Sequence, residues 1–201
     1  MHFSVLQTGL GTLLLAVALG ANAADATRAL EIVQGKCFIC HGVEGESSSP
    51  LFPRLAGQHA AYVARQLADY KSGRRKSDTM RPMVEDLSAE DFAALGRYFE
   101  TRQPVAHEPP DAELAQVGRY IFDRGNAYSG IPSCASCHGG NGHGTDKLPR
   151  LAGQHAAYTE TQLKKFNSRE RTNDNAIMHT IASKLTELEA KAVSNYISGM
   201  K

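Results

Sequence analysis

The four cysteines of this chain are the residues whose spacing points most directly to chemistry. They stand in two Cys-x-x-Cys-His motifs, at residues 37–41 and 134–138. Within a helical turn, positions i and i+3 lie on one face, with Cβ atoms about 5–6 Å apart. Two thiols placed in this way can add to the two vinyl groups on one edge of a haem, and the histidine that follows then lies under the iron as an axial ligand.

The motifs therefore predict two covalently bound haem c groups. The residues expected to hold them are Cys37, Cys40 and His41 in the first motif, and Cys134, Cys137 and His138 in the second. The Cys-x-x-Cys spacing also occurs in redox dithiols, disulfides and zinc sites. Each pair lies in its own repeat, which disfavours one shared zinc site, and the lack of a βαβ pattern disfavours a thioredoxin-like dithiol.

The sequence contains an internal duplication. Residues 53–62 read PRLAGQHAAY, and residues 149–158 read the same. Ten identical residues do not recur by chance in a chain of this length. The offset between the copies is 97 at the cysteines, 96 at the decapeptide and 98 near the end, so only a few single-residue insertions separate them.

A proline-rich segment separates the two copies. Three prolines in residues 103–110 oppose helix and favour an extended connection. We therefore expect an N-terminal domain over residues 24–102, a linker over 103–110 and a C-terminal domain over 111–201. Domains of this size have a thin core and often rely on a cofactor for stability.

Helical signals fill both copies, and no stretch alternates with period two for long enough to suggest a strand. We expect helices over about residues 26–34 and 111–123, and further helices that begin near His59 and His155. A last helix is expected from Ser88 to about residue 99, and from Thr186 to about residue 197, because an acidic residue follows each start by three positions. The expected fold class is all-α.

The second axial ligand is sought among residues that recur downstream of the motifs. Counting back from Leu87 and Leu185, Met80 aligns with Met178, and these methionines follow the motif histidines by 39 and 40 residues. A thioether is a soft ligand that favours ferrous iron. The recurrence therefore predicts Met80 and Met178 as iron ligands, whereas Met83 has no methionine counterpart and is expected to serve packing.

His59 and His155 are the competing ligand candidates, because they also recur. They follow the motif histidines by only 18 and 17 residues, at a junction between a proline-containing loop and a helix. We therefore expect these two histidines at the start of a helix, on the surface or at a haem edge, rather than on iron.

The amino-terminal residues have the features of a secretory signal peptide. Residues 10–19 form an apolar run that is too short to span a bilayer, and Ala21-Asn22-Ala23 follows as a small-x-small cleavage pattern. Because the first four residues carry no Lys or Arg, an uncleaved anchor is the alternative. We expect residues 1–23 to be removed from an exported protein that then begins at Ala24.

Composition excludes two further classes of protein. The 22 Lys and Arg residues are balanced by 21 Asp and Glu residues, and the formal net charge is +1. A basic nucleic-acid binder and an acidic tail are both excluded, and we expect no nucleic-acid partner. Arg74-Arg75-Lys76 is the only basic cluster, and we expect it to be a solvated loop rather than a docking patch.

The repeated decapeptide is a closer copy than packing requires, since cores tolerate swaps of similar volume. Its polar members are Arg54, Gln58, His59 and Tyr62, and they recur as Arg150, Gln154, His155 and Tyr158. We expect these residues to line the haem edges and the interface between the domains, where a pseudo-twofold axis would use the same segment from both sides.

The chain resembles the class I c-type cytochromes, and among them the dihaem cytochrome c4 family. The likeness rests on the two CxxCHG motifs, the two PRLAGQHAAY segments followed by QL, the two aligned methionines, and RTND at residues 171–174. It covers the whole chain after residue 23. The resemblance implies two tandem cytochrome c domains, His/Met ligation in both, and haem histidines oriented by the carbonyls of Pro53 and Pro149.

The resemblance also implies a periplasmic electron carrier. Its donor would lie on the quinol–cytochrome c reductase side and its acceptor would be a haem–copper terminal oxidase, while peripheral membrane association is left open. A haem iron with two protein ligands has no open position for oxygen or peroxide, so the expected role is a carrier and not an enzyme.

Three other functions are weighed against this one. A dihaem peroxidase should lack one axial methionine, whereas two recur here. The cytochrome subunit of a periplasmic dehydrogenase would share every feature of this sequence and is kept as the alternative. A zinc-binding interaction module would be colourless.

Overall fold

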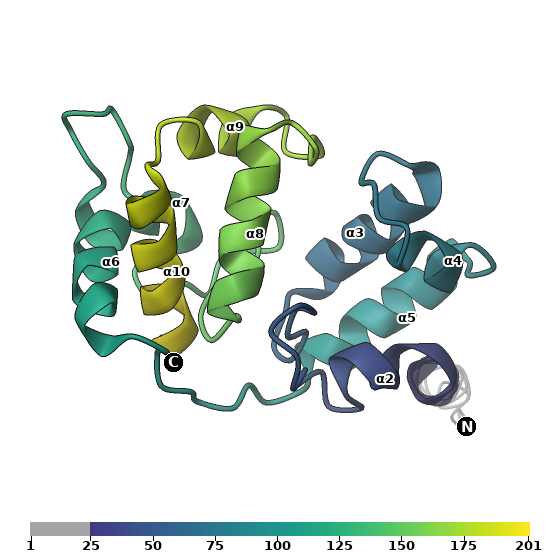
Figure 1. Cartoon of the computed structure of the whole chain (residues 1–201). Coiled ribbons are helices and arrows are strands. Elements are labelled where there is room, and N and C mark those ends of the chain that lie inside the picture. The colour runs from purple at the N-terminus through teal and green to yellow at the C-terminus, as the bar shows by residue number, and fades with distance from the viewer. Residues whose placement is uncertain (1–24) are drawn as a thin grey trace, which may run out of the picture.

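The computed structural model describes residues 25–201, so the expected leader at residues 1–23 lies outside the described part. Two helical halves lie side by side, and an extended segment joins them along one edge of the molecule (Figure 1). In residues 25–201 the extended pairing is confined to two isolated bridges, Arg75 with Arg171 and Asn126 with Ile131. The all-α fold class is confirmed.

The N-terminal half begins with helical backbone that runs unbroken from residue 25 to His41. It is α-helical over residues 25–32, passes through the π-helical turn η1 (Val33–Cys37) and ends as α2 (Phe38–His41). The remaining helices are α3 (Ala60–Ser72), α4 (Met80–Val84) and α5 (Ala89–Glu100). Val33, Val84 and Leu95 are at most 1% exposed and form the centre of this half's core.

The C-terminal half has the same order of elements. They are α6 (Ala112–Arg124), α7 (Ala135–His138), α8 (Ala156–Asn167), α9 (Ile177–Ala182) and α10 (Glu187–Gly199). Phe122 and Val193 are at the centre of its core. Helices α6 and α10 cross at Gly118, where a Cβ atom would collide with the backbone carbonyl of Ala192. A glycine is therefore what lets these two helices approach so closely.

The halves differ just before the Cys-x-x-Cys-His motifs. The separate helix expected over residues 26–34 is instead continuous with the motif helix. In the C-terminal half, α6 ends at Gly125, whose φ of 72° places it outside the helical region, and a loop closed by the Asn126–Ile131 bridge precedes α7. A Cβ atom at Gly125 would meet the carbonyl oxygen of Ile131, so this sharp exit requires glycine.

Both final helices begin with the capping box that the sequence predicts. The Ser88 hydroxyl accepts from the Asp91 N–H at 3.2 Å, and the Asp91 carboxylate accepts from the Ser88 N–H at 3.0 Å. Thr186 and Glu189 form the same pair at 3.2 and 2.9 Å. Each cap contributes on the order of 1 kcal/mol to the stability of its helix.

The segment between α5 and α6 is extended, in keeping with its prolines. It is fastened to the N-terminal half through Glu46, whose carboxylate accepts from the Val105 N–H at 3.1 Å and contacts His107 Nε2 at 3.2 Å. Among residues 25–201, no helix combines the length and the apolar character that a membrane crossing needs.

Candidate functional site

Both Cys-x-x-Cys-His motifs lie on a helical turn, as haem attachment requires. No disulfide joins any of the four cysteines, which all lie in the described residues. Burial raises the pKa of the Cys37 thiol and of the Cys134 thiol to about 11 in each case. Reactive dithiols and zinc thiolates depend on a lowered thiol pKa, so the redox-dithiol interpretation is disfavoured. In the part of the chain that is described, no three His, Cys, Asp or Glu side chains converge on a common point, which removes the shared zinc site.

The motif histidines are oriented by backbone carbonyls. His41 Nδ1 lies 2.8 Å from the Pro53 oxygen, and His138 Nδ1 lies 3.1 Å from the Pro149 oxygen. A carbonyl only accepts, so each Nδ1 carries the proton and each Nε2 keeps its lone pair for a metal. Burial lowers the pKa of both imidazoles, so both rings are neutral at pH 7. This donor set fits haem iron, and the carbonyl bond raises the basicity of the ligating nitrogen.

The methionine register deduced from sequence is reproduced by the backbone. The same turn follows both short helices, since the Leu87 N–H donates to the Val84 carbonyl and the Leu185 N–H donates to the Ala182 carbonyl, each at 3.2 Å. Counting back from these turns places Met80 at the start of α4 and Met178 at the corresponding position of α9.

Met80 and Met178 differ from Met83 in how far they are buried. Met80 packs against the core of the N-terminal half, and Met178 is half-buried. Met83 is 39% exposed and lies at the surface of this half. The C-terminal copy has two extra residues before its methionine, and Asn175 and Ala176 take left-handed φ values of 51° and 65° there.

His59 and His155 lie between the two halves, as the N-cap residues of α3 and α8. His59 Nε2 is 2.8 Å from the His143 carbonyl, and His155 Nε2 is 2.7 Å from the Ser47 carbonyl. Each ring thus bonds to the loop that follows the other half's motif. In these two rings the Nε2 that could bind a metal is hydrogen-bonded to a backbone carbonyl. In His41 and His138, by contrast, the carbonyl bond is at Nδ1 and Nε2 is left for a metal.

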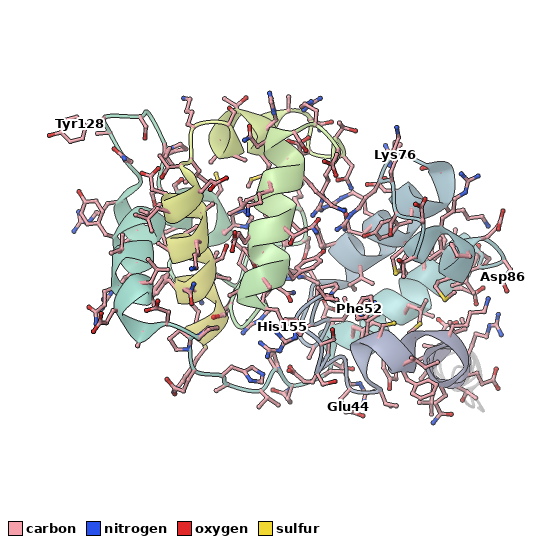
Figure 2. The ribbon with its side chains drawn as sticks, in the orientation of Figure 1. Glu44, Phe52, Lys76, Asp86, Tyr128 and His155 are labelled. Carbon is pink, nitrogen blue, oxygen red and sulfur yellow. The ribbon has the colours of Figure 1, made fainter. Side chains whose placement is uncertain are left out.

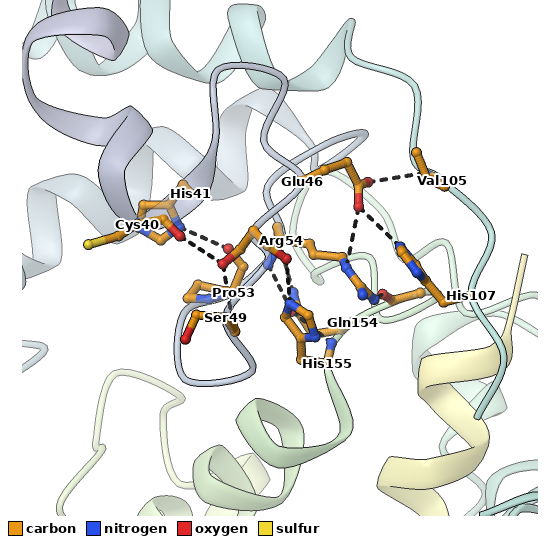
Figure 3. Close-up of polar contacts among 12 residues, drawn as sticks. Cys40, His41, Glu46, Ser49, Pro53, Arg54, Val105, His107, Gln154 and His155 are labelled. Atoms are coloured by element: carbon orange, nitrogen blue, oxygen red, sulfur yellow. Dashed lines mark hydrogen bonds and ion pairs between the residues drawn. The ribbon is translucent and has the colours of Figure 1, made fainter. Parts of the chain in front are cut away.

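The glutamines of the repeated decapeptide join the halves reciprocally. The Gln154 amide accepts from the Arg54 N–H and donates to the Arg54 carbonyl, both at 2.9 Å (Figure 3). The Gln58 amide makes the same two bonds to the backbone of Arg150, at 2.8 and 2.9 Å. The expectation that this segment lines the domain interface is confirmed for its polar residues.

Arg75 corrects the interpretation of the basic cluster as a solvated loop. Lys76 projects into solvent (Figure 2), but Arg75 is only 7% exposed. Its guanidinium donates to Gln66 Oε1 in its own half, and to Tyr158 and Gln162 in the other half, at 2.8, 2.8 and 3.0 Å. A run of charged residues indicates a solvated surface only if no other element covers it, and here helix α8 covers Arg75.

Arg171 makes the mirror-image contacts. It is 8% exposed and donates to Gln162 in its own half at 3.0 Å, and to Tyr62 and Gln66 in the other half at 3.0 and 3.1 Å. Sequence reasoning missed this cluster. The signal that could have found it is the shared offset of 96 between Gln66 and Gln162 and between Arg75 and Arg171.

A helical unit that occurs twice, with a haem-attachment turn in each copy, defines the chain as a two-domain c-type cytochrome. Residues 115–201 match the family model "Cytochrome c", and residues 24–99 match "Cytochrome C oxidase, cbb3-type, subunit III". A cytochrome c4 from Thiocapsa roseopersicina is 41% identical over 170 residues, which cover 83% of this chain and 88% of that protein. The protein therefore belongs to the cytochrome c4 family.

Two further relatives bear on function. The crystal structure of reduced recombinant cytochrome c4 from Pseudomonas stutzeri matches with a TM-score of 0.83 at 38% identity, covering 88% of this chain and 98% of that one. A thiosulfate dehydrogenase electron acceptor from Thiomonas intermedia is 34% identical over 167 residues, covering 81% of this chain and 77% of that protein. The chain is thus a dihaem electron-transfer protein that carries two covalently bound haem c groups and serves redox partners.

Proposed function

We propose that this protein is a periplasmic electron carrier whose two haem irons are each held by one histidine and one methionine. The ligand pairs are His41 with Met80 and His138 with Met178. The observation that carries this proposal is that both motif histidines are buried and neutral, with Nδ1 engaged by a proline carbonyl. The domains extend over residues 24–102 and 111–201, with residues 103–110 as the linker.

The chain's own contribution is to keep ligation constant while the iron changes charge. A haem c with two protein ligands gains and loses one electron with little rearrangement. The proline carbonyls fix the orientation of His41 and His138, and helices α4 and α9 present the two methionines. If one histidine and one methionine hold each iron, no position would be left open for peroxide, which supports a carrier rather than an enzyme.

The proposed electron path runs from the quinol–cytochrome c reductase side to a haem–copper terminal oxidase. The alternative is the cytochrome subunit of a periplasmic dehydrogenase, which accepts the electrons that the catalytic chain releases. A thiosulfate dehydrogenase electron acceptor among the relatives supports that alternative. Stopped-flow mixing of the reduced protein with an oxidase, and of the oxidised protein with a thiosulfate dehydrogenase and its substrate, distinguishes the two by which reaction is fast.

The decisive experiment for the proposal is a haem count on protein made with its native leader. Two haems per chain should remain with the polypeptide after acid–acetone extraction, because each motif forms two thioethers. Extractable haem, or one haem per chain, contradicts the proposal. Amino-terminal sequencing of the same sample should begin at Ala24, and an intact Met1 in a membrane fraction would contradict the periplasmic assignment.

A further inference from the structure

The peptide group between Pro53 and Arg54 is hydrogen-bonded at both of its ends. Its carbonyl oxygen accepts from His41 Nδ1 at 2.8 Å, and its N–H donates to Gln154 Oε1 at 2.9 Å (Figure 3). His41 belongs to the N-terminal half and Gln154 to the C-terminal half. A haem histidine in one half is therefore connected to a side-chain amide of the other half through a single conjugated peptide unit.

The same connection occurs in the opposite direction. The peptide group between Pro149 and Arg150 accepts from His138 Nδ1 at 3.1 Å and donates to Gln58 Oε1 at 2.8 Å. Each glutamine also donates its Nε2–H to the carbonyl of the same arginine, at 2.9 Å in both halves. Because the carbonyl can only accept, this second bond fixes which end of the amide faces the arginine N–H.

Each acceptor oxygen also receives a second N–H donor. Gln154 Oε1 also accepts from the His155 N–H at 3.0 Å, and Gln58 Oε1 accepts from the His59 N–H at 3.2 Å. Gln58 is 6% exposed, so water screens its bonds little. Hydrogen bonds in a chain strengthen one another when they are removed from water.

These bonds have a predictable effect on the histidine. An amide N–H that donates a hydrogen bond leaves its own peptide carbonyl richer in electron density, and that carbonyl then draws the Nδ1 proton more strongly. A histidine that donates a stronger bond from Nδ1 is a better electron donor through Nε2. A better donor stabilises ferric iron, so the glutamine bond lowers the reduction potential of the haem on that histidine.

We propose that Gln154 is a positioning residue for His41, and Gln58 for His138, so that each domain sets the electron-donating strength of the haem histidine in the other domain. This inference rests on the proposed function, in which His41 and His138 are axial ligands. The docking of the two domains is then a direct determinant of both potentials, and neither haem's potential is a property of its own domain alone.

The test is a redox titration of the holoprotein and of the variants Gln154→Leu and Gln58→Leu. Proton NMR follows each haem separately, with haem signals assigned to a half by their contacts with that half's side chains. Gln154→Leu should raise the potential of the haem in the N-terminal half, and Gln58→Leu should raise that of the C-terminal half. The Nδ1 proton of the affected histidine should move to higher field as its bond weakens.

A second variant separates this effect from general loosening of the interface. Gln154→Glu keeps an acceptor oxygen and makes it stronger, so the N-terminal haem's potential should fall rather than rise. The control is Arg65→Ala, which removes the bond from Arg65 to the Lys147 carbonyl at 2.8 Å across the same interface without touching either proline–arginine peptide. Both potentials should be unchanged in that control.

The inference is overturned if the Leu and Glu variants shift the N-terminal potential in the same direction. It is also overturned if Gln154→Leu shifts only the haem of its own half, or neither haem. Failure of the proposed function is a separate result, because it would show in the wild-type protein as an absorption spectrum without His/Met ligation. If Gln154→Leu does not fold, the contrast between Gln154→Glu and Arg65→Ala still decides the question.

Discussion

Arg75 and Arg171 face each other across the boundary between the two halves as an antiparallel bridge pair, and their guanidinium groups share the same two glutamine acceptors. Each cation also lies over an aromatic ring, Arg75 over Tyr70 at 4.7 Å and Arg171 over Phe166 at 4.5 Å. Among the described residues, neither guanidinium forms an ion pair with a carboxylate. Two positive charges are thus buried in the interface between the haem domains.

Removing one of these buried charges should lower the potential of both haems. A nearby cation favours the reduced, less positive iron, and burial leaves this attraction poorly screened. We expect Arg75→Met to lower both potentials in a redox titration. Lys76→Met is the matched control, since it removes the same charge from the adjacent, solvent-facing position and should change little. Equal shifts in the two variants would show that burial of Arg75 has no part in tuning.

If Met80 and Met178 are the iron ligands, as proposed, replacement of either one should remove half of the far-red absorption band that sulfur gives with ferric iron. Met80→Ala and Met178→Ala should each do so, and each should lower the potential of its own haem, because loss of the soft thioether favours ferric iron. Met83→Ala should leave the band intact. A spectrum in which Met83→Ala loses the band and Met80→Ala retains it would show that the register of the methionines is wrong.

The crossing of α6 and α10 should not tolerate a side chain at Gly118. Gly118→Ala forces the Ala192 carbonyl to move, and overpacking of this kind costs about 1–3 kcal/mol. Guanidinium unfolding of the holoprotein should show this loss. Gly140→Ala is the control, because a Cβ atom there meets nothing within 4 Å. A stability loss as large in the control as at Gly118 would rule out a steric cause.

His155 should make the protein less stable as the pH falls. Burial is the main cause that lowers the pKa of this ring below its ordinary value of 6.5, and the charges of Arg54 and His107 lower it further. The hydrogen bond to the Ser47 carbonyl and the charge of Glu46 raise the pKa, but they do not cancel the effect of burial. The unfolded chain therefore takes up a proton at a higher pH than the folded protein does. The free energy of unfolding contributed by this group is full above about pH 6.5 and declines as the pH drops below it.

The measurement is the free energy of unfolding of wild type and of His155→Gln between about pH 7.5 and about pH 5. Glutamine keeps a donor for the Ser47 carbonyl but does not titrate. The variant should lose less stability over this range than the wild type, and the difference between the two should be constant above neutral pH. If the free energies of unfolding of the two proteins fall in parallel over the whole pH range, His155 does not contribute to the loss of stability in acid.

Short-range information in the sequence was sufficient for most of the longer helices and for the haem-attachment turns. The capping boxes at Ser88 and Thr186, and the alignment of Met80 with Met178 by counting back from Leu87 and Leu185, depend on residues a few positions apart. Because the chain is duplicated, each of these sequence patterns occurs twice. The end of the helix expected over residues 111–123 was correct, since α6 ends at Arg124. The continuation of the first helix past residue 34 to His41 was not expected, because Gly35 stays within helical backbone whereas Gly125 leaves the helix against Ile131.

The sequence by itself determined the fold class, the two haem-attachment motifs and the aligned methionines, because each is written in local spacing or in the repeat. Only the tertiary structure decided what the polar residues between the motifs do. Arg75 belongs to a charged run that local rules place in solvent, and Gln154 bonds to a backbone 100 positions away. Such contacts arise from how two folded halves dock, and no local pattern encodes which face of one half will cover the other.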